Sequence, residues 1–288
     1  MNIKIAIPAK GRMREPSIRL LESAGIKLRE SEERSLFIRT NRPEIDVISV
    51  RTEDIPEFVE NGAVELGITG QDMVAEAGVN VAELLPLNYG SCSLILAVPE
   101  KSEIKSVKDL KDCMKVATKF ENIAKNFLKK NGKKAEVITL SGSLEIAPLL
   151  GLAEAIVDLT STGTTLRTHG LKIVDTILDS QAVFIGNKEA MKEAGKKAII
   201  DDIMLALQGV VSAEKKKYLM VNLPEGKLPE LERVCGGMLS PTITKLDKEG
   251  WISAQMVVEE KGIFDMVKKI KGIGGRDILV LPIERMVL

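Results

Sequence analysis

A polar stretch near the middle of the chain has the residue types of an anion-binding loop. Residues 158–165, DLTSTGTT, follow the apolar run AIV and carry five hydroxyl groups, one glycine and one carboxylate. A helix is predicted to begin near Thr164, and amide N–H groups at a helix start lie unpaired at the positive end of its dipole. Because Gly163 lets a ligand approach the backbone closely, the stretch could hold a phosphate without a cation. A capped polar turn is the simpler alternative, and the local pattern leaves both open.

Two carboxylates could complement such a phosphate. Asp158, at the predicted end of the strand, would repel an anion in its own loop but suits a neighbouring sugar hydroxyl. Glu145 lies in the turn before that strand, and by itself it is typical of a surface carboxylate. Paired with Asp158, it could accept a second hydroxyl. Two acids beside a phosphate loop describe a site for a phosphorylated ribose.

Charged residues also follow three predicted strands in the first part of the chain. Lys10-Gly11-Arg12 follows the first strand, Arg51 the second and Asp72 the third. Ligands of open α/β folds bind at the carboxyl ends of the strands, where these residues would meet. Each residue alone is typical of a solvated turn. Together they predict a clamp for a polyphosphate, in which arginine provides a fork and lysine a point charge.

The other reactive residue types do not form a recognisable catalytic group. His169 is the only histidine, and its place near a predicted helix end favours a local structural role, so no Ser-His-Asp or Cys-His arrangement can be assembled. The sequence has no P-loop and no glycine motif for dinucleotides. Cys92, Cys113 and Cys235 lack metal-ligand spacing, and their odd count makes a poor disulfide framework. The cysteines therefore indicate a reducing cytoplasm.

Composition excludes two classes of partner. Lys+Arg and Asp+Glu both number 41 in 288 residues, so the net charge is zero, whereas a general nucleic-acid binder needs a basic excess. The apolar run at the N-terminus is too short for a signal peptide, and no segment approaches the roughly 20 apolar residues that span a bilayer. We therefore expect a cytoplasmic protein of two or three domains that neither crosses a membrane nor binds nucleic acid.

The elements that must position these residues alternate between strands and helices. Apolar runs at residues 3–7, 46–50 and 66–68 predict strands of a largely parallel sheet, and Asp54 is expected to cap a helix between them. The alternation restarts near residue 93, where a second set of strands leads to the DLTSTGTT stretch. There Thr118 and Glu121 have the spacing of a capping box.

The last third of the chain completes the predicted architecture. A strand over 179–187 and a helical stripe near 203–211 return the chain to the first lobe, and the remainder has the order βαββαβ. We predict an α/β protein with a two-lobed core like the type II periplasmic binding proteins and a C-terminal ferredoxin-like domain. The predicted boundaries are 1–91 with 178–211 for lobe I, 92–177 for lobe II and 212–288 for the last domain. A cleft between two lobes is a usual place for a small ligand.

Seven segments together resemble the long form of the ATP phosphoribosyltransferase family, whose members catalyse the first step of histidine biosynthesis. The segments are IAIPAKGRM, RTEDIPEFVENGAVELGITGQDM, GSCSLILAVP, EAIVDLTSTGTTL, GGMLSPTIT, GWISAQMVV and GGRDILVLPI. They keep the family's order and cover all the predicted domains. The chain departs from the family's pattern at Met13, Glu65 and Ser93, where leucine, aspartate and a basic residue are more usual.

The resemblance implies a reaction between ATP and phosphoribosyl pyrophosphate (PRPP), in which adenine N1 displaces pyrophosphate from the anomeric carbon. Such chemistry needs oriented substrates and a stabilised cationic ribosyl centre rather than a covalent nucleophile, and Mg²⁺ would arrive mostly on the substrate phosphates. It implies that PRPP binds Glu145, Asp158, Thr160, Ser161, Thr162, Gly163, Thr164 and Thr165. It implies that the ATP and pyrophosphate side is lined by Lys10, Gly11, Arg12, Arg51 and Asp72.

The resemblance also implies regulation by histidine through the C-terminal domain. The segment LSPTIT is the best match there, with Leu239, Ser240 and Thr242 as candidate ligands, and a rigid proline-containing strand entry is the alternative. The family implies homo-oligomers, namely dimers that assemble to hexamers. From the residues alone, two other functions stay open: a two-lobed small-ligand-binding module without catalysis, and an interaction protein regulated through its tail.

Overall fold

The computed structural model describes residues 2–29, 36–235 and 241–287. The chain divides into two compact units, Met1–Glu22 with Ile26–Met204 and Ser23–Gly25 with Leu205–Leu288. Within the described residues, no helix combines the length and the apolar character needed to cross a bilayer.

The first sheet of the larger unit has six strands in the order β2-β3-β1-β4-β11-β5. Its strands are β1 (Ile3–Pro8), β2 (Phe37–Arg39), β3 (Ile45–Val50), β4 (Leu66–Gly70), β5 (Ala82–Pro86) and β11 (Ala182–Gly186). The helices that follow its early strands are α1 (Arg14–Ser23), α2 (Ile55–Glu60) and α3 (Gln71–Ala77). β1 pairs in parallel with both β3 and β4, as the apolar runs predicted, so their carboxyl ends lie at one edge.

The second sheet has five strands in the order β10-β6-β9-β7-β8. These are β6 (Cys92–Pro99), β7 (Lys115–Thr118), β8 (Glu136–Thr139), β9 (Ala155–Thr160) and β10 (Leu171–Ser180), with helices α4 (Glu121–Lys130) and α5 (Thr164–Thr168). Leu94, Leu96 and Val98 on β6 pack with Phe120 and Leu128 in the core on one face. Short 3-10 helices are η2 (Val107–Asp109), η3 (Leu144–Ile146), η4 (Ala190–Lys192) and η5 (Glu225–Lys227).

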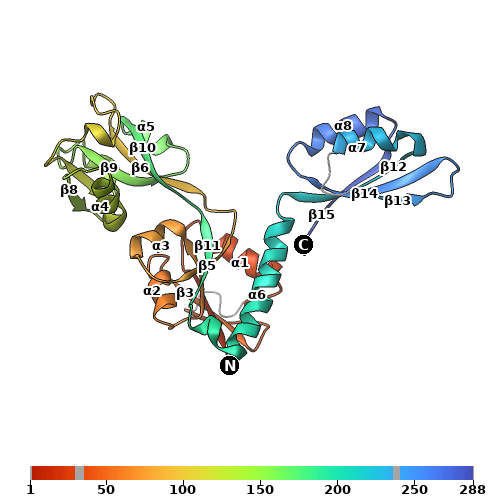
Figure 1. Cartoon of the computed structure of the whole chain (residues 1–288), viewed down its shortest axis with the longest axis horizontal. Helices are drawn as coiled ribbons and strands as arrows, with labels where there is room; N and C mark the ends of the chain where they lie inside the picture. Colours follow the sequence, from red (N-terminus) through yellow and green to blue (C-terminus); the bar gives the residue numbers. More distant parts are fainter. Residues whose placement is uncertain (1, 30–35, 236–240, 288) are drawn as a thin grey trace. The chain divides into compact units, whose positions relative to one another are not determined.

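The chain passes between these two sheets twice, once from β5 to β6 and once from β10 to β11 (Figure 1). The two connections are joined where the Ala182 N–H donates to the Tyr89 carbonyl and the Leu87 N–H donates to the Ala182 carbonyl, both at 2.9 Å. The prediction of two α/β lobes with two crossings is confirmed. The single strand predicted over 179–187 is wrong, because the chain leaves the second sheet at Ser180 and enters the first at Ala182.

Two predicted helix caps are wrong in detail. The Thr118 hydroxyl donates to the Val157 carbonyl of the neighbouring strand at 2.8 Å and accepts from the Phe120 N–H at 2.9 Å. Thr118 therefore does not cap α4. Asp54 does stand immediately before α2, but its side chain makes no capping hydrogen bond. Both residues stand where the predictions place them, but neither side chain caps its helix.

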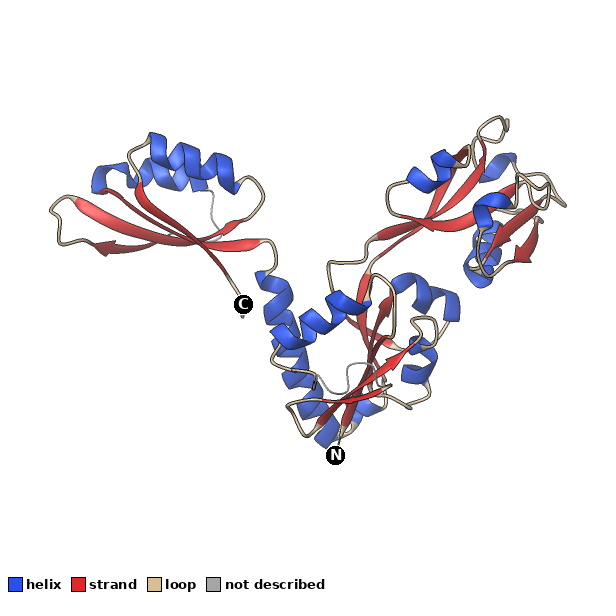
Figure 2. Ribbon diagram, turned by 180° about the vertical axis from the view of Figure 1, so that it is seen from behind, coloured by secondary structure: helices blue, strands red, loops and turns tan. Residues whose placement is uncertain are grey.

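The smaller unit contains the predicted ferredoxin-like domain. After α6 (Ala194–Ala213), which the boundary between the units divides, the chain forms β12 (Lys216–Pro224), α7 (Leu228–Cys235), β13 (Thr242–Lys245), β14 (Trp251–Glu259), α8 (Ile263–Gly272) and β15 (Arg276–Pro282). The strand order is β13-β14-β12-β15, and α7 and α8 cover one face of this sheet (Figures 1 and 2). Leu219, Val221 and Leu223 alternate along β12 and pack under the helices with Leu231 and Ile270. The βαββαβ prediction is confirmed.

Candidate functional site

The carboxyl edge of the first sheet gathers the charged residues expected there. Lys10 and Arg12 follow β1, Arg51 follows β3, and Asp72 lies in the first turn of α3 after β4. Since the three strands are parallel, all four residues belong to one edge. Gly11 has a φ of 84°, which a side chain would adopt at a cost, so glycine makes the turn that carries Arg12 away from β1.

Arg12 connects this edge to the hydroxyl-rich loop of the second sheet. Its Nη1 donates a hydrogen bond of 2.8 Å to Ser161 Oγ. The guanidinium also lies beside the buried thiol of Cys92. Burial raises the pKa of Cys92, the Asp72 carboxylate adds to the rise, and Arg12 opposes it. The thiol therefore stays protonated at neutral pH, next to one cation and one anion.

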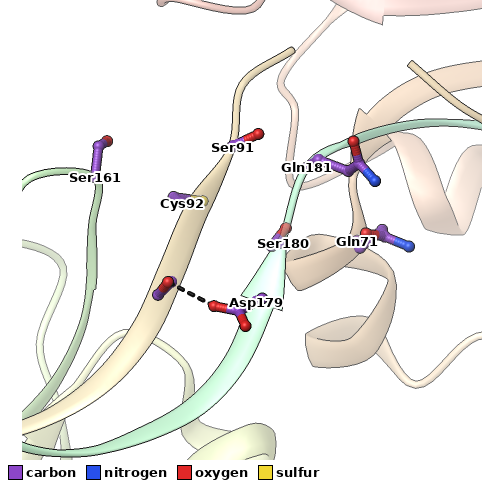
Figure 3. Close-up of a pocket in the computed structure, with 8 residues that line it drawn as sticks. Gln71, Ser91, Cys92, Ser161, Asp179, Ser180 and Gln181 are labelled. Atoms are coloured by element: carbon purple, nitrogen blue, oxygen red, sulfur yellow. Dashed lines mark hydrogen bonds between the residues drawn. The ribbon is translucent and has the colours of Figure 1, made fainter. Parts of the chain in front are cut away.

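A polar cavity of about 360 Å³ lies at this junction (Figure 3). It is lined by Gln71, Ser91, Cys92, Ser93, Ser161, Asp179, Ser180 and Gln181. In Figure 3, Ser161 approaches from its own loop while Cys92 and Asp179 lie on the neighbouring strands β6 and β10. Ser93 Oγ donates to Asp179 Oδ1 at 2.6 Å across these strands, so both side chains are held in place. The cavity presents mainly hydroxyl and amide groups to a ligand.

Asp72 is turned toward the crossing between the lobes. It is 5% exposed, its Oδ1 accepts from the Ser180 hydroxyl at 2.7 Å, and its N–H donates to the same oxygen of Ser180 at 3.0 Å. Oδ1 lies so close to Gly70 that a Cβ there would approach it within 2.1 Å, which explains the second glycine of the LGITGQD segment. One carboxylate oxygen is thus committed to Ser180.

The hydroxyl-rich loop connects β9 to α5. The helix begins at Thr164, as predicted, and Gly163 precedes it with a φ of 69°. β9 continues through Thr160, which pairs with Ser93, so Asp158 lies inside the strand; its predicted place at the strand end is wrong. Thr160 Oγ1 accepts the Gly163 N–H at 2.8 Å and closes the loop at its base.

The other hydroxyl-bearing residues of the loop lie at the surface. Ser161, Thr162, Thr164 and Thr165 are all exposed, and the hydroxyls of Thr162 and Thr164 lie 3.0 Å apart. A cation that the sequence reasoning missed adjoins them: Arg167 Nη2 donates to the Thr162 carbonyl at 3.1 Å. Its place on α5, four residues after Gly163, is the signal that could have found it.

The two carboxylates expected beside the loop lie within electrostatic reach of each other. Burial raises the pKa of Asp158, the Leu159 N–H and the Lys119 ammonium oppose the rise, and the Glu145 carboxylate adds to it. The Leu159 N–H donates to Asp158 Oδ1 at 2.8 Å. Lys119, which directly follows β7, was not singled out from the sequence. The half-buried pair is suited to accept hydroxyl donors.

Other residues named from the sequence have plainer surroundings. Lys10 and Arg51 are exposed, while Arg14 Nη1 donates to Ser49 Oγ at 2.8 Å and joins the ends of β1 and β3. His169 Nδ1 lies 2.8 Å from the Thr165 carbonyl at the end of α5, which confirms its structural role. Among the residues that the structure describes, no three His, Cys, Asp or Glu side chains are placed to hold a metal ion.

The candidate histidine ligands fall mostly beyond the described part of the chain. Leu239 and Ser240 lie outside the described residues. Thr242 is the exposed first residue of β13 and pairs with Gln255 of β14.

Fold and cavity together define a two-lobed α/β protein with a candidate anion-binding site and an appended ferredoxin-like domain. The model of the family described as ATP phosphoribosyltransferase matches residues 51–209, and the model described as HisG, C-terminal domain, matches residues 213–285. The chain is 44% identical over 288 residues to the ATP phosphoribosyltransferase of Methanothermobacter thermautotrophicus, covering 100% of both chains. It is 45% identical over 290 residues to that of Methanosarcina acetivorans, covering 99% of each.

A solved structure agrees with these sequence relatives. The ATP phosphoribosyl transferase (HisG:HisZ) complex from Thermotoga maritima contains a chain that is 28% identical, with a TM-score of 0.63 over 72% of this chain and 96% of that chain. The protein belongs to the ATP phosphoribosyltransferase family. Family membership favours an enzyme over a ligand-binding module without catalysis.

Proposed function

We propose that the cavity beside Arg12 and Ser161 is the active site in which this pentosyltransferase joins ATP to PRPP. In that reaction adenine N1 displaces pyrophosphate from the anomeric carbon of the ribose and gives phosphoribosyl-ATP, as the first step of histidine biosynthesis. One observation supports the location above all: a guanidinium from the first lobe meets a hydroxyl of the loop in the second lobe at 2.8 Å. Groups from both lobes therefore converge on one point, as a two-substrate reaction requires.

The loop between β9 and α5 is proposed to hold the 5-phosphate of PRPP. Exposed hydroxyls of Ser161, Thr162, Thr164 and Thr165 can donate to phosphate oxygens, and the first amides of α5 add further donors. The roles of Thr160 and Gly163 are different from the one expected. Thr160 uses its hydroxyl to accept the Gly163 N–H, so these two residues shape the loop.

Asp158 and Glu145 are proposed to bind the ribose hydroxyls. The Glu145 carboxylate helps to raise the pKa of half-buried Asp158, and hydroxyl donors would offset this effect by stabilising the ionised carboxylate. The two adjacent hydroxyls of the ribose offer one such donor to each carboxylate. The negative pair can also stabilise positive charge that develops at the ribosyl centre.

The cations at the carboxyl edge of the first sheet are proposed to face the pyrophosphate and the ATP. Arg12 offers a planar fork, while Lys10 and Arg51 are exposed and able to follow a polyphosphate. Bound Mg²⁺ would neutralise phosphate charge, and we propose that it arrives on the substrate, because it keeps several waters and takes few protein ligands. Asp158 and Glu145, and Asp179 in the lining of the cavity, are carboxylates that could meet it. Asp72, tied to Ser180, is better suited to fix the crossing than to bind substrate.

No covalent intermediate is part of the proposal. The nucleophile is a neutral ring nitrogen and pyrophosphate is a good leaving group once its charge is neutralised, so the residues act by orientation and charge. The protonated thiol of Cys92 is unsuited to nucleophilic attack.

We further propose that the ferredoxin-like domain binds histidine as a feedback inhibitor, with Thr242 as one ligand, and that the protein works in the cytoplasm as a homo-oligomer. Regulation of this kind needs two states that differ in histidine affinity. The match of residues 213–285 to the HisG, C-terminal domain supports the presence of the regulatory module.

The activity is tested by mixing the full chain with ATP, PRPP and Mg²⁺ and measuring pyrophosphate and phosphoribosyl-ATP. Both products should appear in equal amounts and only when both substrates are present. Pyrophosphate release without the nucleotide product would indicate PRPP hydrolysis, and binding of PRPP without either product would indicate a binding module.

A further inference from the structure

One peptide group in the middle of the hydroxyl-rich loop is held at both ends. The peptide between Thr162 and Gly163 donates its N–H to Thr160 Oγ1 at 2.8 Å, and its carbonyl accepts from Arg167 Nη2 at 3.1 Å. In a trans peptide the N–H and the carbonyl point in opposite directions within one rigid plane. Bonds on both sides therefore fix the orientation of that plane.

Arg167 is well placed to act as the outer half of this clamp. It lies on α5, where its backbone N–H donates to the Gly163 carbonyl at 3.1 Å. Its Nη2 lies 3.5 Å from Thr164 Oγ1, which is itself 3.0 Å from Thr162 Oγ1. One guanidinium thus contacts the residues on both sides of Gly163. The bond to the carbonyl is charge-assisted and stronger than a neutral one.

Gly163 is the residue that makes room for the clamp. Its φ of 69° is in the left-handed region, and a Cβ at this position would lie 3.3 Å from Arg167 Nη1. A side chain there would strain the backbone and crowd the guanidinium, which would have to shift by a few tenths of an ångström. The glycine is therefore required by the clamp as well as by the turn.

The clamp decides which loop groups can bind an anion. The Gly163 N–H and the Thr160 hydroxyl are paired with each other, so the hydroxyls at the surface of the loop are the ones that an anion can reach. These are the hydroxyls of Ser161, which accepts from Arg12 and keeps its own proton to donate, of Thr162 and Thr164, which lie 3.0 Å apart, and of Thr165. Their Cα positions depend on the clamped peptide, because it joins the two halves of the loop. Arg167 also supplies the first positive charge after the loop, since residues 158–166 contain no lysine or arginine.

We propose that Thr160 and Arg167 are positioning residues that preform the phosphate loop by clamping the peptide between Thr162 and Gly163. The proposal rests on the function proposed for the loop, namely binding of the 5-phosphate of PRPP. A loop held in its binding conformation before the ligand arrives avoids the cost of ordering it. Loss of either half of the clamp should weaken binding of the 5-phosphate and leave the ATP side of the reaction unchanged.

The test compares paired variants by steady-state kinetics. In Arg167→Gln and Thr160→Val, the KM for PRPP should rise on the order of tenfold to a hundredfold, since the Arg167 bond is charge-assisted and the loss of the part-buried Thr160 oxygen leaves the Gly163 N–H without its acceptor. The KM for ATP and kcat should stay within about threefold. Thr160→Ser keeps the acceptor oxygen and should restore most of the loss, while Arg167→Lys should restore only part of it because lysine lacks the fork.

A matched control uses Arg233, whose Nε donates to the Pro229 carbonyl at 3.2 Å on α7 in the other unit. Arg233→Gln removes a similar local bond and should leave both KM values unchanged. A double variant, Thr160→Val with Arg167→Gln, should lose less than the product of the two single effects, because both bonds hold one peptide.

Binding of ribose 5-phosphate and of pyrophosphate, measured by calorimetry, separates the two ends of PRPP. The clamp variants should bind ribose 5-phosphate more weakly and pyrophosphate as well as the wild type. Wild-type affinity for ribose 5-phosphate in Arg167→Gln and Thr160→Val would overturn the clamp, even with an active wild-type enzyme. An inactive wild-type enzyme that binds no PRPP would instead overturn the proposed function. If circular dichroism shows that Arg167→Gln and Thr160→Val do not fold, ribose 5-phosphate binding is measured in Thr160→Ser and Arg167→Lys instead. The clamp predicts weaker binding in Arg167→Lys than in Thr160→Ser, and wild-type affinity in both would overturn it.

Discussion

The guanidinium of Arg12 donates a hydrogen bond of 2.8 Å to the hydroxyl of Ser161, a residue 149 positions away in the chain. Arg12 follows the first strand of one sheet, and Ser161 follows the fourth strand of the other in chain order. The bond places the cation of the KGR segment at the loop proposed to hold the 5-phosphate. Arg12 can therefore act on both substrates.

Arg12→Gln is expected to lower kcat/KM for PRPP on the order of tenfold to a hundredfold, because a hydrogen bond to a charged group contributes roughly 1.5–3 kcal/mol. Pyrophosphate-release kinetics measure the change. Arg19→Gln is the matched control, since Arg19 is an exposed arginine on α1. Equal rates for Arg12→Gln and the wild type would remove Arg12 from the site.

Gly163→Val is expected to abolish PRPP binding while the protein still folds. The φ of 69° is unfavourable for valine, and its Cβ would crowd Arg167 Nη1 at 3.3 Å. Gly132→Val is the control, because Gly132 has a φ of 68° with nothing within 4 Å of its Cβ position. Calorimetry with PRPP should separate the two variants, although both lose a similar amount of stability. PRPP affinity reduced equally in both would trace the effect to stability alone.

The pH dependence of PRPP binding is expected to report on Asp158. Burial raises the pKa of Asp158 above 3.8, and the Glu145 carboxylate adds to the rise. Ribose hydroxyls donate more strongly to the ionised carboxylate than to the protonated acid, so PRPP affinity should increase as the pH rises through this raised pKa. Glu145→Gln removes the repelling charge and should move the transition to lower pH, although it also weakens binding. A transition that stays in place would mean that the two carboxylates do not interact.

The raised pKa of Asp158 also makes the stability of the protein depend on pH, in the opposite direction to PRPP binding. Because the folded pKa lies above the unfolded value, the contribution of Asp158 to the free energy of unfolding is fully present below pH 3.8 and is lost as the pH rises through the folded pKa. Asp158→Asn should therefore stabilise the protein at neutral pH relative to the wild type. Urea unfolding at neutral and acidic pH measures the difference, which should vanish in acid.

Thr242→Val is expected to weaken inhibition by histidine without changing the uninhibited rate. Thr242 and Thr244 both lie exposed on β13, two residues apart and on the same face of the strand. Thr244→Val is therefore a close control for surface and strand effects. Inhibition curves that coincide for Thr242→Val and Thr244→Val would place the histidine site elsewhere.

Much of the fold followed from the sequence because the signals are local. The parallel strands ending before Lys10, Arg51 and Asp72 were predicted from apolar runs, and the start of α5 at Thr164 from the glycine and threonines before it. The βαββαβ order was predicted in the same way. Each of these depends on a few neighbouring residues and on burial of one face.

The errors and omissions arise where a distant partner decides the outcome. Thr118 has the spacing of a capping box, but its hydroxyl bonds to Val157 on the neighbouring strand. Asp158 lies within β9 because that strand is paired with β6 as far as Thr160. The contact between Arg12 and Ser161 has no local signature at all. Pairing between neighbouring strands places Thr118 and Asp158, and contact between the two lobes places Arg12 against Ser161. Partners so far apart in the chain leave no signal in a short window of sequence.

The central claim is that the loop from Ser161 to Thr165 holds the 5-phosphate of PRPP while Asp158 and Glu145 face its ribose. A crystal structure of the full chain with PRPP and Mg²⁺ tests this most directly. We predict the 5-phosphate within hydrogen-bond distance of the Ser161, Thr162, Thr164 or Thr165 hydroxyls, and the ribose hydroxyls at the two carboxylates. A 5-phosphate bound at Lys10 and Arg51, with the hydroxyl-rich loop empty, would contradict the account.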